Sequence, residues 1–247
     1  MKRLKVKTEN DPCVIYAFAD THFGNVGQDK KKLARHIQAC KDENAYWVHL
    51  GDWVEGITHK DKRSDVRLSG GNVLTEYGDA YHAFLPIKDQ GLAILEGNHD
   101  SVISSVYGDN VELLAATLNT PYLGYGGYID LKTPLKKITF LIHHGMGMGF
   151  LLGAKAINVH RLSHKFKADV FLMGHVHTDL RHQHPFGNKN KYYAIVPSYF
   201  NPYGNGRGTN YAVRSASYPQ VTGCLRIEIG TPIRTGQSFV RMELLSE

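Results

Sequence analysis

Five short apolar runs of this chain end in polar residues that can bind a metal ion. The run "CVIYAFAD" leads into "ADTH", "YWVHL" leads into "GD", and "GLAIL" is followed by "EGNHD". Further along, "KKITFLI" is followed by "HHG" and "DVFLM" by "GHVH". Helix-like segments such as "KKLARHIQAC" separate the runs, a rhythm typical of an α/β fold. Because chemistry in such folds gathers at the carboxyl ends of strands, we expect the five polar ends to form one site.

The last quarter of the chain has a different pattern. From Tyr192 onward, β-rich segments are separated by turn-rich loops. With 42% hydrophobic residues and 247 residues in all, the chain can bury a large core. No low-complexity tract, internal repeat or linker marks a boundary, so we predict a single domain over residues 1–247.

The net charge, the hydropathy and the cysteines limit which kinds of partner and which cellular location we expect. The net charge of +6 allows an anionic partner such as a phosphate ester or nucleic acid, although the basic residues are scattered and form no tail. No segment approaches the roughly 20 apolar residues of a membrane span, so we expect no membrane partner. Cys13, Cys40 and Cys224 show no CxxC spacing, which indicates neither a disulfide framework nor a thiolate metal site. We therefore expect a reducing, cytoplasmic location.

Two of the polar ends repeat the same spacing. Asp20 and His22 lie two residues apart in "DTH", and His175 and His177 do so in "GHVH". In extended backbone such residues point to the same side about 7 Å apart, so both can approach one cation. Gly174 leaves room for a close backbone approach. Each pair alone is a weak signal.

The other three ends each add one candidate ligand. Asp52 follows a glycine, Asn98 follows a second glycine, and "HHG" offers His143 and His144. A lone histidine at a strand end is usually structural. Five such ends in one chain are hard to explain by chance, so we interpret them together as a metal site.

Taken as a set, these motifs resemble those of the calcineurin-like metallophosphoesterase superfamily. Its pattern of DxH, GD, GNHD or GNHE, a lone His and GHxH matches "ADTH", "GDW", "EGNHD", "HHG" and "GHVH" over roughly Val14 to His177. The resemblance implies a four-layer αββα sandwich of two mixed β-sheets flanked by helices. It also implies hydrolysis of phosphomonoesters or phosphodiesters at two metal ions.

The resemblance also implies a role for each candidate ligand. One metal ion would be held by Asp20, His22 and His177, and the other by Asn98, His144 and His175. Asp52 would bridge them, and the ligand in the family's His-Gly variant is the residue before glycine, which selects His144 over His143. Carboxylate, amide and imidazole ligands without thiolate suit divalent transition metals, of which we favour Mn²⁺ over Fe, Ni, Co or Zn.

The resemblance then implies a catalytic role for the stretch "EGNHD". Gly97 would make the turn, and His99 would be free of metal to protonate the leaving oxygen while a metal-bridging hydroxide attacks phosphorus. Such a histidine needs an orienting partner, and Asp100 is the adjacent candidate.

Two alternatives to a general phosphoesterase stay open. The chain lacks the arginine of the "GDxVDRG" motif of the Ser/Thr phosphatases, and its "GNHD" resembles nucleases of the Mre11 and SbcD type acting on DNA or RNA. A nuclease is disfavoured by the lack of a capping domain and of a basic and aromatic strand-binding stretch. A non-catalytic scaffold of the same fold is disfavoured because every motif position is filled. The sequence indicates neither the substrate nor the oligomeric state.

Three other parts of the chain carry basic or histidine residues that can bind an anion or a metal ion. The basic segment Thr58 to Gly71 follows the proposed bridging ligand and can be either a pocket wall or a solvated loop. Arg207 is more typical of an exposed turn than of a phosphate contact. His182 and His184 in "HQH" precede Pro185, so we expect a loop there without a function.

Overall fold

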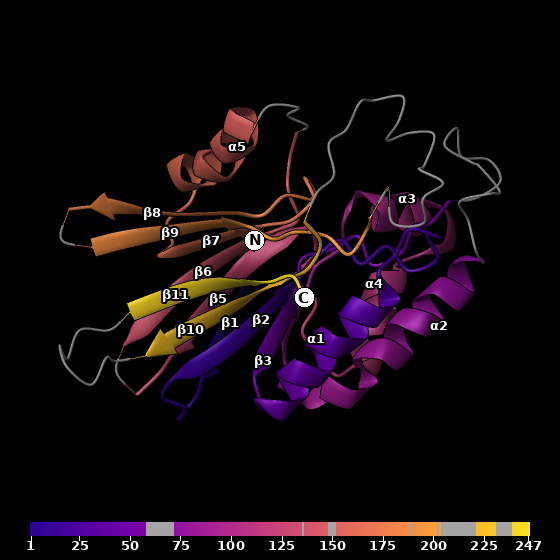
Figure 1. The fold of residues 1–247 in the computed structure, drawn as a ribbon, viewed down its shortest axis with the longest axis horizontal. Coiled ribbons are helices and arrows are strands. Elements are labelled where there is room, and N and C mark those ends of the chain that lie inside the picture. The colour runs from indigo at the N-terminus through magenta and orange to yellow at the C-terminus, as the bar shows by residue number, and fades with distance from the viewer. Residues whose placement is uncertain are drawn as a thin grey trace.

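Two mixed β-sheets lie face to face in the computed structural model, and helices cover both outer faces (Figure 1). This arrangement confirms the predicted αββα sandwich. The residues that the structure describes are 1–57, 72–134, 136–147, 152–187, 189–201, 203, 221–230 and 239–247. The segment Thr58 to Gly71 and Arg207, which the sequence singled out, lie outside these residues.

The larger sheet has six strands. In spatial order they are β1 (Lys2–Lys7), β5 (Gly126–Lys132), β6 (Lys137–His143), β7 (Val170–Met173), β9 (Lys189–Ile195) and β8 (Leu180–Phe186). β6, β7 and β9 run parallel, β5 pairs antiparallel with β6 and parallel with β1, and β8 pairs antiparallel with β9. The parallel strands therefore begin at one end of the sheet and finish at the other.

The smaller sheet has five strands. They follow the order β11 (Phe239–Leu245), β10 (Cys224–Gly230), β2 (Cys13–Phe18), β3 (Tyr46–His49) and β4 (Gly91–Ile94). β2, β3 and β4 run parallel, whereas β10 pairs antiparallel with β2 and with β11.

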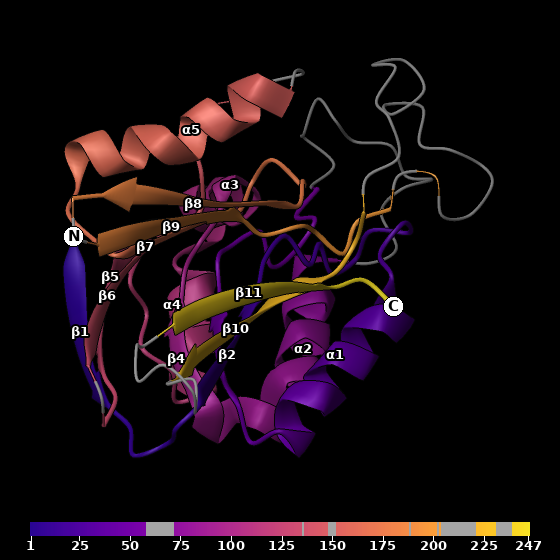
Figure 2. The same ribbon diagram turned by 60° about the vertical axis from the view of Figure 1, so that its left-hand side comes forward.

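Helices cover the two sheets unequally. The smaller sheet carries α1 (Lys30–Asp42), α2 (Val73–Phe84), α3 (Asn98–Tyr107), α4 (Asn110–Thr117) and a 3₁₀ turn (Leu85–Gln90), and the larger sheet carries α5 (Leu152–Lys165) (Figures 1 and 2). Asp29 caps α1 by accepting a hydrogen bond from the Lys32 amide, as expected of a side chain preceding a helix. No helix among the described residues is both long and apolar enough to cross a membrane.

Alternation along β2 explains the layers. Cys13, Ile15 and Ala17 face the other sheet and form part of the central core, whereas Tyr16 and Phe18 pack against the helices. Because both faces of β2 are buried, its sequence is a continuous apolar run rather than an alternating one. This strand holds the "DTH" motif in a rigid position at its carboxyl end.

One expectation about local structure is wrong. His182 and His184 lie in β8, where their side chains are exposed, and not in a loop. Pro185 is tolerated because β8 is the edge strand of its sheet, where a missing amide proton costs least.

Candidate metal centre

The ligands predicted from the sequence meet where five strands end. β2, β3 and β4 finish at the same edge of the smaller sheet, and β6 and β7 finish together in the larger one. The side chains gathered there are Asp20, His22, Asp52, Asn98, His144, His175 and His177. Both sheets therefore contribute to one site.

The first group of ligands comprises Asp20, His22, Asp52 and His177, whose ligand atoms lie within 4.8 Å of one another. The Nε2 atoms of His22 and His177 are 3.2 Å apart, and His177 Nε2 is 3.3 Å from Asp20 Oδ1. All but His177 are buried. Imidazole nitrogens and carboxylate oxygens at this spacing suit a borderline divalent ion.

The second group comprises Asp52, His144 and His175. His144 Nε2 lies 3.5 Å from Asp52 Oδ2 and 3.1 Å from the amide oxygen of Asn98. The neighbouring His143 instead accepts a hydrogen bond from the Gly145 amide through Nδ1. The structure thus brings His144 to the cluster, and Asp52 belongs to both groups.

The carboxylates of this buried site are held ionised. Burial alone would raise the pKa of Asp52, but the charge of His144 and its hydrogen bond hold that pKa well below its usual range. In return, the carboxylate of Asp52 outweighs burial and raises the pKa of His144 to about 9. The pKa of Asp20 is lowered as well. A buried site that keeps the carboxylates of Asp20 and Asp52 ionised needs positive charge close by, from protons or from metal ions.

The hydrogen bond of His22 tests whether the side chains of the first group are suited to bind a metal ion. Its Nδ1 lies 3.0 Å from a carboxylate oxygen of Glu55, which only accepts, so Nδ1 carries the proton. In the neutral form of the ring the lone pair is then on Nε2, which lies close to His177 and to the carboxylates of Asp20 and Asp52. This donor set fits a metal ion.

The backbone at the ligands differs from the extended form assumed from the spacing. The left-handed residues include Asp20 (φ 49°), His22 (φ 46°), Asp52 (φ 53°), His175 (φ 70°) and His177 (φ 49°). They lie beyond the strand ends, where the chain turns sharply and brings side chains closer than the roughly 7 Å of a strand. Non-glycine residues rarely adopt this conformation, and such strain is typical of functional sites.

At two glycines of the motifs, Gly97 and Gly174, the structure leaves no room for a Cβ atom. Gly97 has φ −112°, which lies outside the left-handed region that favours glycine, so its backbone conformation does not explain the residue. A Cβ there would clash with Asp52 and would lie 2.6 Å from His144 Cε1. A Cβ on Gly174 would lie 2.9 Å from Asp20 Oδ2, in agreement with the expected close approach.

His99 lies beside the ligands, but the expected role of Asp100 is wrong. His99 Nδ1 is 2.7 Å from the carbonyl oxygen of Glu55, and the His99 amide donates to Asp52 Oδ1. Asp100 accepts hydrogen bonds from the amides of Gly97 and Trp53. It thus caps α3 and ties that helix to the loop after β3, because its side chain points back along the helix end.

Glu55 is the functional residue that sequence reasoning missed. Its carboxylate binds His22 Nδ1 and its carbonyl binds His99, so one residue holds both rings. Burial alone would raise the pKa of Glu55, but the hydrogen bond and charge of His22 lower it to about 2. The acidic residue three positions after Asp52 in "GDWVEG" was the available signal.

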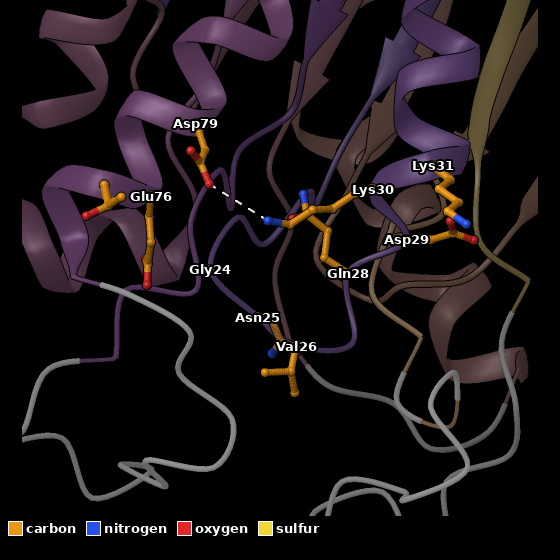
Figure 3. Close-up of a pocket in the computed structure, with 10 residues that line it drawn as sticks. Gly24, Asn25, Val26, Gln28, Asp29, Lys30, Lys31, Glu76 and Asp79 are labelled. Atoms are coloured by element: carbon orange, nitrogen blue, oxygen red, sulfur yellow. Dashed lines mark ion pairs between the residues drawn. The ribbon is translucent and has the colours of Figure 1, made fainter.

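A cavity of about 480 Å³ is lined by residues that follow His22 in the chain, beginning at Gly24. It lies between the segment that follows His22 and helix α2, and Lys30 and Asp79 face each other across it at 3.8 Å (Figure 3). Glu76 lines it and accepts a hydrogen bond from the amide of Gly56, next to Glu55. Most of the residues that line it are polar or charged.

Comparison with known proteins agrees with the fold. No family model and no curated protein matches the sequence. Among solved structures, the phosphoesterase YfcE of E. coli is 14% identical (TM-score 0.49, covering 94% of this chain and 98% of that one). Vps29 of Entamoeba histolytica in complex with Zn²⁺ is 10% identical (TM-score 0.46, 94% and 98%). GAP50, the anchor in the inner membrane complex of Plasmodium, is 10% identical (TM-score 0.50, 96% and 89%).

At identities of 10 to 14%, the likeness concerns the fold alone. The chemistry must be argued from this chain's own residues.

Proposed function

We propose that this chain is a metal-dependent phosphoesterase of the calcineurin-like metallophosphoesterase superfamily, with a dinuclear centre. The observation that carries the proposal is the position of Asp52, which belongs to both groups of ligands. A carboxylate shared in this way suits two ions about 3.5–4 Å apart, the separation found in two-metal hydrolases.

The ligands divide between the two ions. Asp20, His22 and His177 would hold the first ion, Asn98, His144 and His175 the second, and Asp52 both. The absence of thiolate favours Mn²⁺, Fe, Co, Ni²⁺ or Zn²⁺, with Mn²⁺ our first choice. When bound, the ions would supply an activated water and neutralise charge on the phosphoryl oxygens.

His99 is the proposed general acid. Its Nδ1 bonds to the carbonyl of Glu55, and Nε2 is the nitrogen proposed to deliver a proton to the leaving oxygen. Its amide bonds to Asp52, which fixes the ring relative to the shared ligand.

Hydrolysis by the metal-reconstituted protein tests this proposal. We expect Mn²⁺-loaded protein to cleave bis-p-nitrophenyl phosphate, p-nitrophenyl phosphate or both, and Asp52→Asn to cleave neither. Inactivity of the wild type with all of Mn²⁺, Ni²⁺, Co²⁺ and Zn²⁺ would contradict the proposal. A well-folded protein that takes up only trace metal by elemental analysis would instead support the non-catalytic alternative.

We also propose a cytoplasmic location. Cys13, Cys40 and Cys224 are all buried free thiols, as is usual in a reducing compartment.

A further inference from the structure

The net positive charge of the chain is concentrated in one stretch. Residues 136–191 contain nine lysines and arginines, two aspartates and no glutamate, a net charge of +7 against +6 for the whole chain. The rest of the chain is therefore close to neutral. The basic residues are spread along the sequence of this stretch, which is why they looked scattered.

The fold collects these residues on the larger sheet and its helix. The stretch forms β6, α5, β7, β8 and the start of β9, which are neighbours in that half of the molecule (Figure 2). Because β6, β7 and β9 run parallel, Lys137 at the start of β6, Lys167 before β7 and Lys189 at the start of β9 lie at one end of the sheet. Burial and the nearby charge of Lys189 lower the pKa of Lys136, in keeping with this crowding.

Most of this charge is not neutralised. Lys137 pairs with Asp130 and Arg181 with Asp179. Within the part of the chain that the structure describes, Arg161, Lys165, Lys167, Lys189 and Lys191 form no ion pair. The surface therefore presents an uncompensated positive field to an anionic partner.

Ring-bearing side chains accompany the charge. His182 and His184 lie on one face of β8 with ring centres 6.2 Å apart, and His160 of α5 lies 5.4 Å from His182. Phe186 at the end of β8 is 64% exposed, and Lys191 Nζ lies 4.1 Å from its ring centre. Exposed flat rings among cations are the features that bind unpaired bases and their phosphates.

We propose that this basic surface, formed by α5, β8 and the start of β9, binds single-stranded nucleic acid. The inference deepens the proposed function, on which it rests for the claim that the bound strand is also the substrate. β8 begins three residues after His177 and extends about 20 Å from the metal centre at the usual rise per residue. A strand lying along it can place a phosphodiester at the centre.

The surface fits a lipid membrane less well. Ile157 and Phe186 are the large apolar side chains that are exposed between 136 and 191 among the described residues. They belong to different elements and form no continuous apolar face, which binding in a membrane interface requires.

Binding of a fluorescein-labelled 12-mer of deoxythymidine, followed by anisotropy in EDTA, tests the proposal. We expect Lys167→Glu/Lys189→Glu to weaken binding at least tenfold and to lower the slope of log affinity against log salt by about 1.4. Lys41→Glu/Lys88→Glu changes net charge equally on exposed lysines of the other half and serves as the control. Phe186→Ala should weaken binding by about fivefold or more through lost stacking.

Three outcomes would overturn the proposal: no binding by the wild type, equal weakening by both double variants, or tighter binding of a duplex than of the single strand. A fourth would be that Lys167→Glu/Lys189→Glu loses binding to vesicles containing phosphatidylserine but keeps its affinity for the oligonucleotide. Because EDTA excludes hydrolysis, failure here is separate from failure of the phosphoesterase proposal. Unchanged hydrolysis of bis-p-nitrophenyl phosphate by Lys167→Glu/Lys189→Glu would show that the variant retains its fold.

Discussion

The Nδ1 atom of the His99 ring is bonded to the carbonyl oxygen of Glu55, and the proposed role of this ring as the acid can be tested by substitution. Replacement by asparagine removes the proton donor but keeps the backbone amide that bonds to Asp52. We expect His99→Asn to retain metal and to lose about 10² to 10⁴ in rate on alkyl phosphate esters. The loss should be smaller on p-nitrophenyl esters, whose leaving group departs without a proton.

Metal content by elemental analysis and rates on both ester types measure this prediction. Loss of metal from His99→Asn would mean that the ring is a ligand. An equal loss on activated and unactivated esters would mean that it is not the acid.

Glu55 acts on two neighbours through different atoms, so its two effects can be separated. Glu55→Gln weakens the hold on His22 Nδ1 but leaves the carbonyl that bonds to His99. Replacing such a partner of a metal ligand typically lowers metal affinity 10- to 100-fold. We expect that loss in a chelator-competition titration, with no change in leaving-group dependence.

Glu112→Gln, on the exposed face of α4, is the matched control and should leave metal affinity unchanged. Wild-type metal affinity in Glu55→Gln would show that the contact with His22 does not matter for metal binding.

At the scale of elements, the sequence predicted the ligands that follow directly after strands, but it did not predict the contacts that are made between loops. Apolar runs locate strand ends, and the strand ends locate Asp20, Asp52 and His144 in one cluster. The hydrogen bond between Glu55 and His22 joins two loops, and the spacing of apolar residues in the sequence gives no signal for such a contact. Asp100 was assigned to His99 because it is adjacent in sequence, whereas capping directs its side chain to the amide of Gly97.

The junction between β4 and α3 tolerates no added atom. In Gly97→Ala the new methyl group meets Asp52 and His144, which are themselves fixed by the strands. We expect markedly lower metal uptake and a melting temperature several degrees lower, because a packed site relaxes poorly.

Gly78→Ala in α2 has no atom within 4 Å of the new carbon and is the control. It should be neutral or stabilise by about 0.5–1 kcal/mol, since alanine favours a helix. Normal metal uptake by Gly97→Ala would contradict the steric explanation.

Helix α2 carries a carboxyl group that should make stability depend on pH. Burial raises the pKa of Glu76 to about 7 from an ordinary value of 4.5. The stabilisation from its protonated form is complete below pH 4.5 and is lost as the pH rises through about 7. We expect Glu76→Gln, whose amide oxygen can still accept from Gly56, to gain melting temperature relative to wild type between pH 5 and 8.

Melting curves of both proteins across that range measure the effect. A constant difference, or one that shrinks as the pH rises, would show that Glu76 is already ionised in the folded protein at pH 5.

At the scale of the whole molecule, the metal centre joins the two sheets. The smaller sheet supplies Asp20, His22 and Asp52, and the larger one supplies His144 and His177. The sequence could not indicate how much of the fold depends on this junction, because strand order within and between sheets is not encoded in any single run.

Metal ions that bridge the sheets should therefore stabilise the fold. Binding only to the folded state adds about 2.7 kcal/mol per site at a metal concentration 100 times the dissociation constant. For a chain of this size that corresponds to a rise in melting temperature of roughly 5–10 °C per site. We expect Mn²⁺ to produce this rise in EDTA-stripped wild type, about half of it in His177→Asn, which lacks one ligand of the first ion only, and almost none in Asp52→Asn. Calorimetry with metal analysis of each sample measures the shift. Equal shifts in all three proteins would mean that the ions bind elsewhere, because only binding at the shared carboxylate makes Asp52→Asn the most affected.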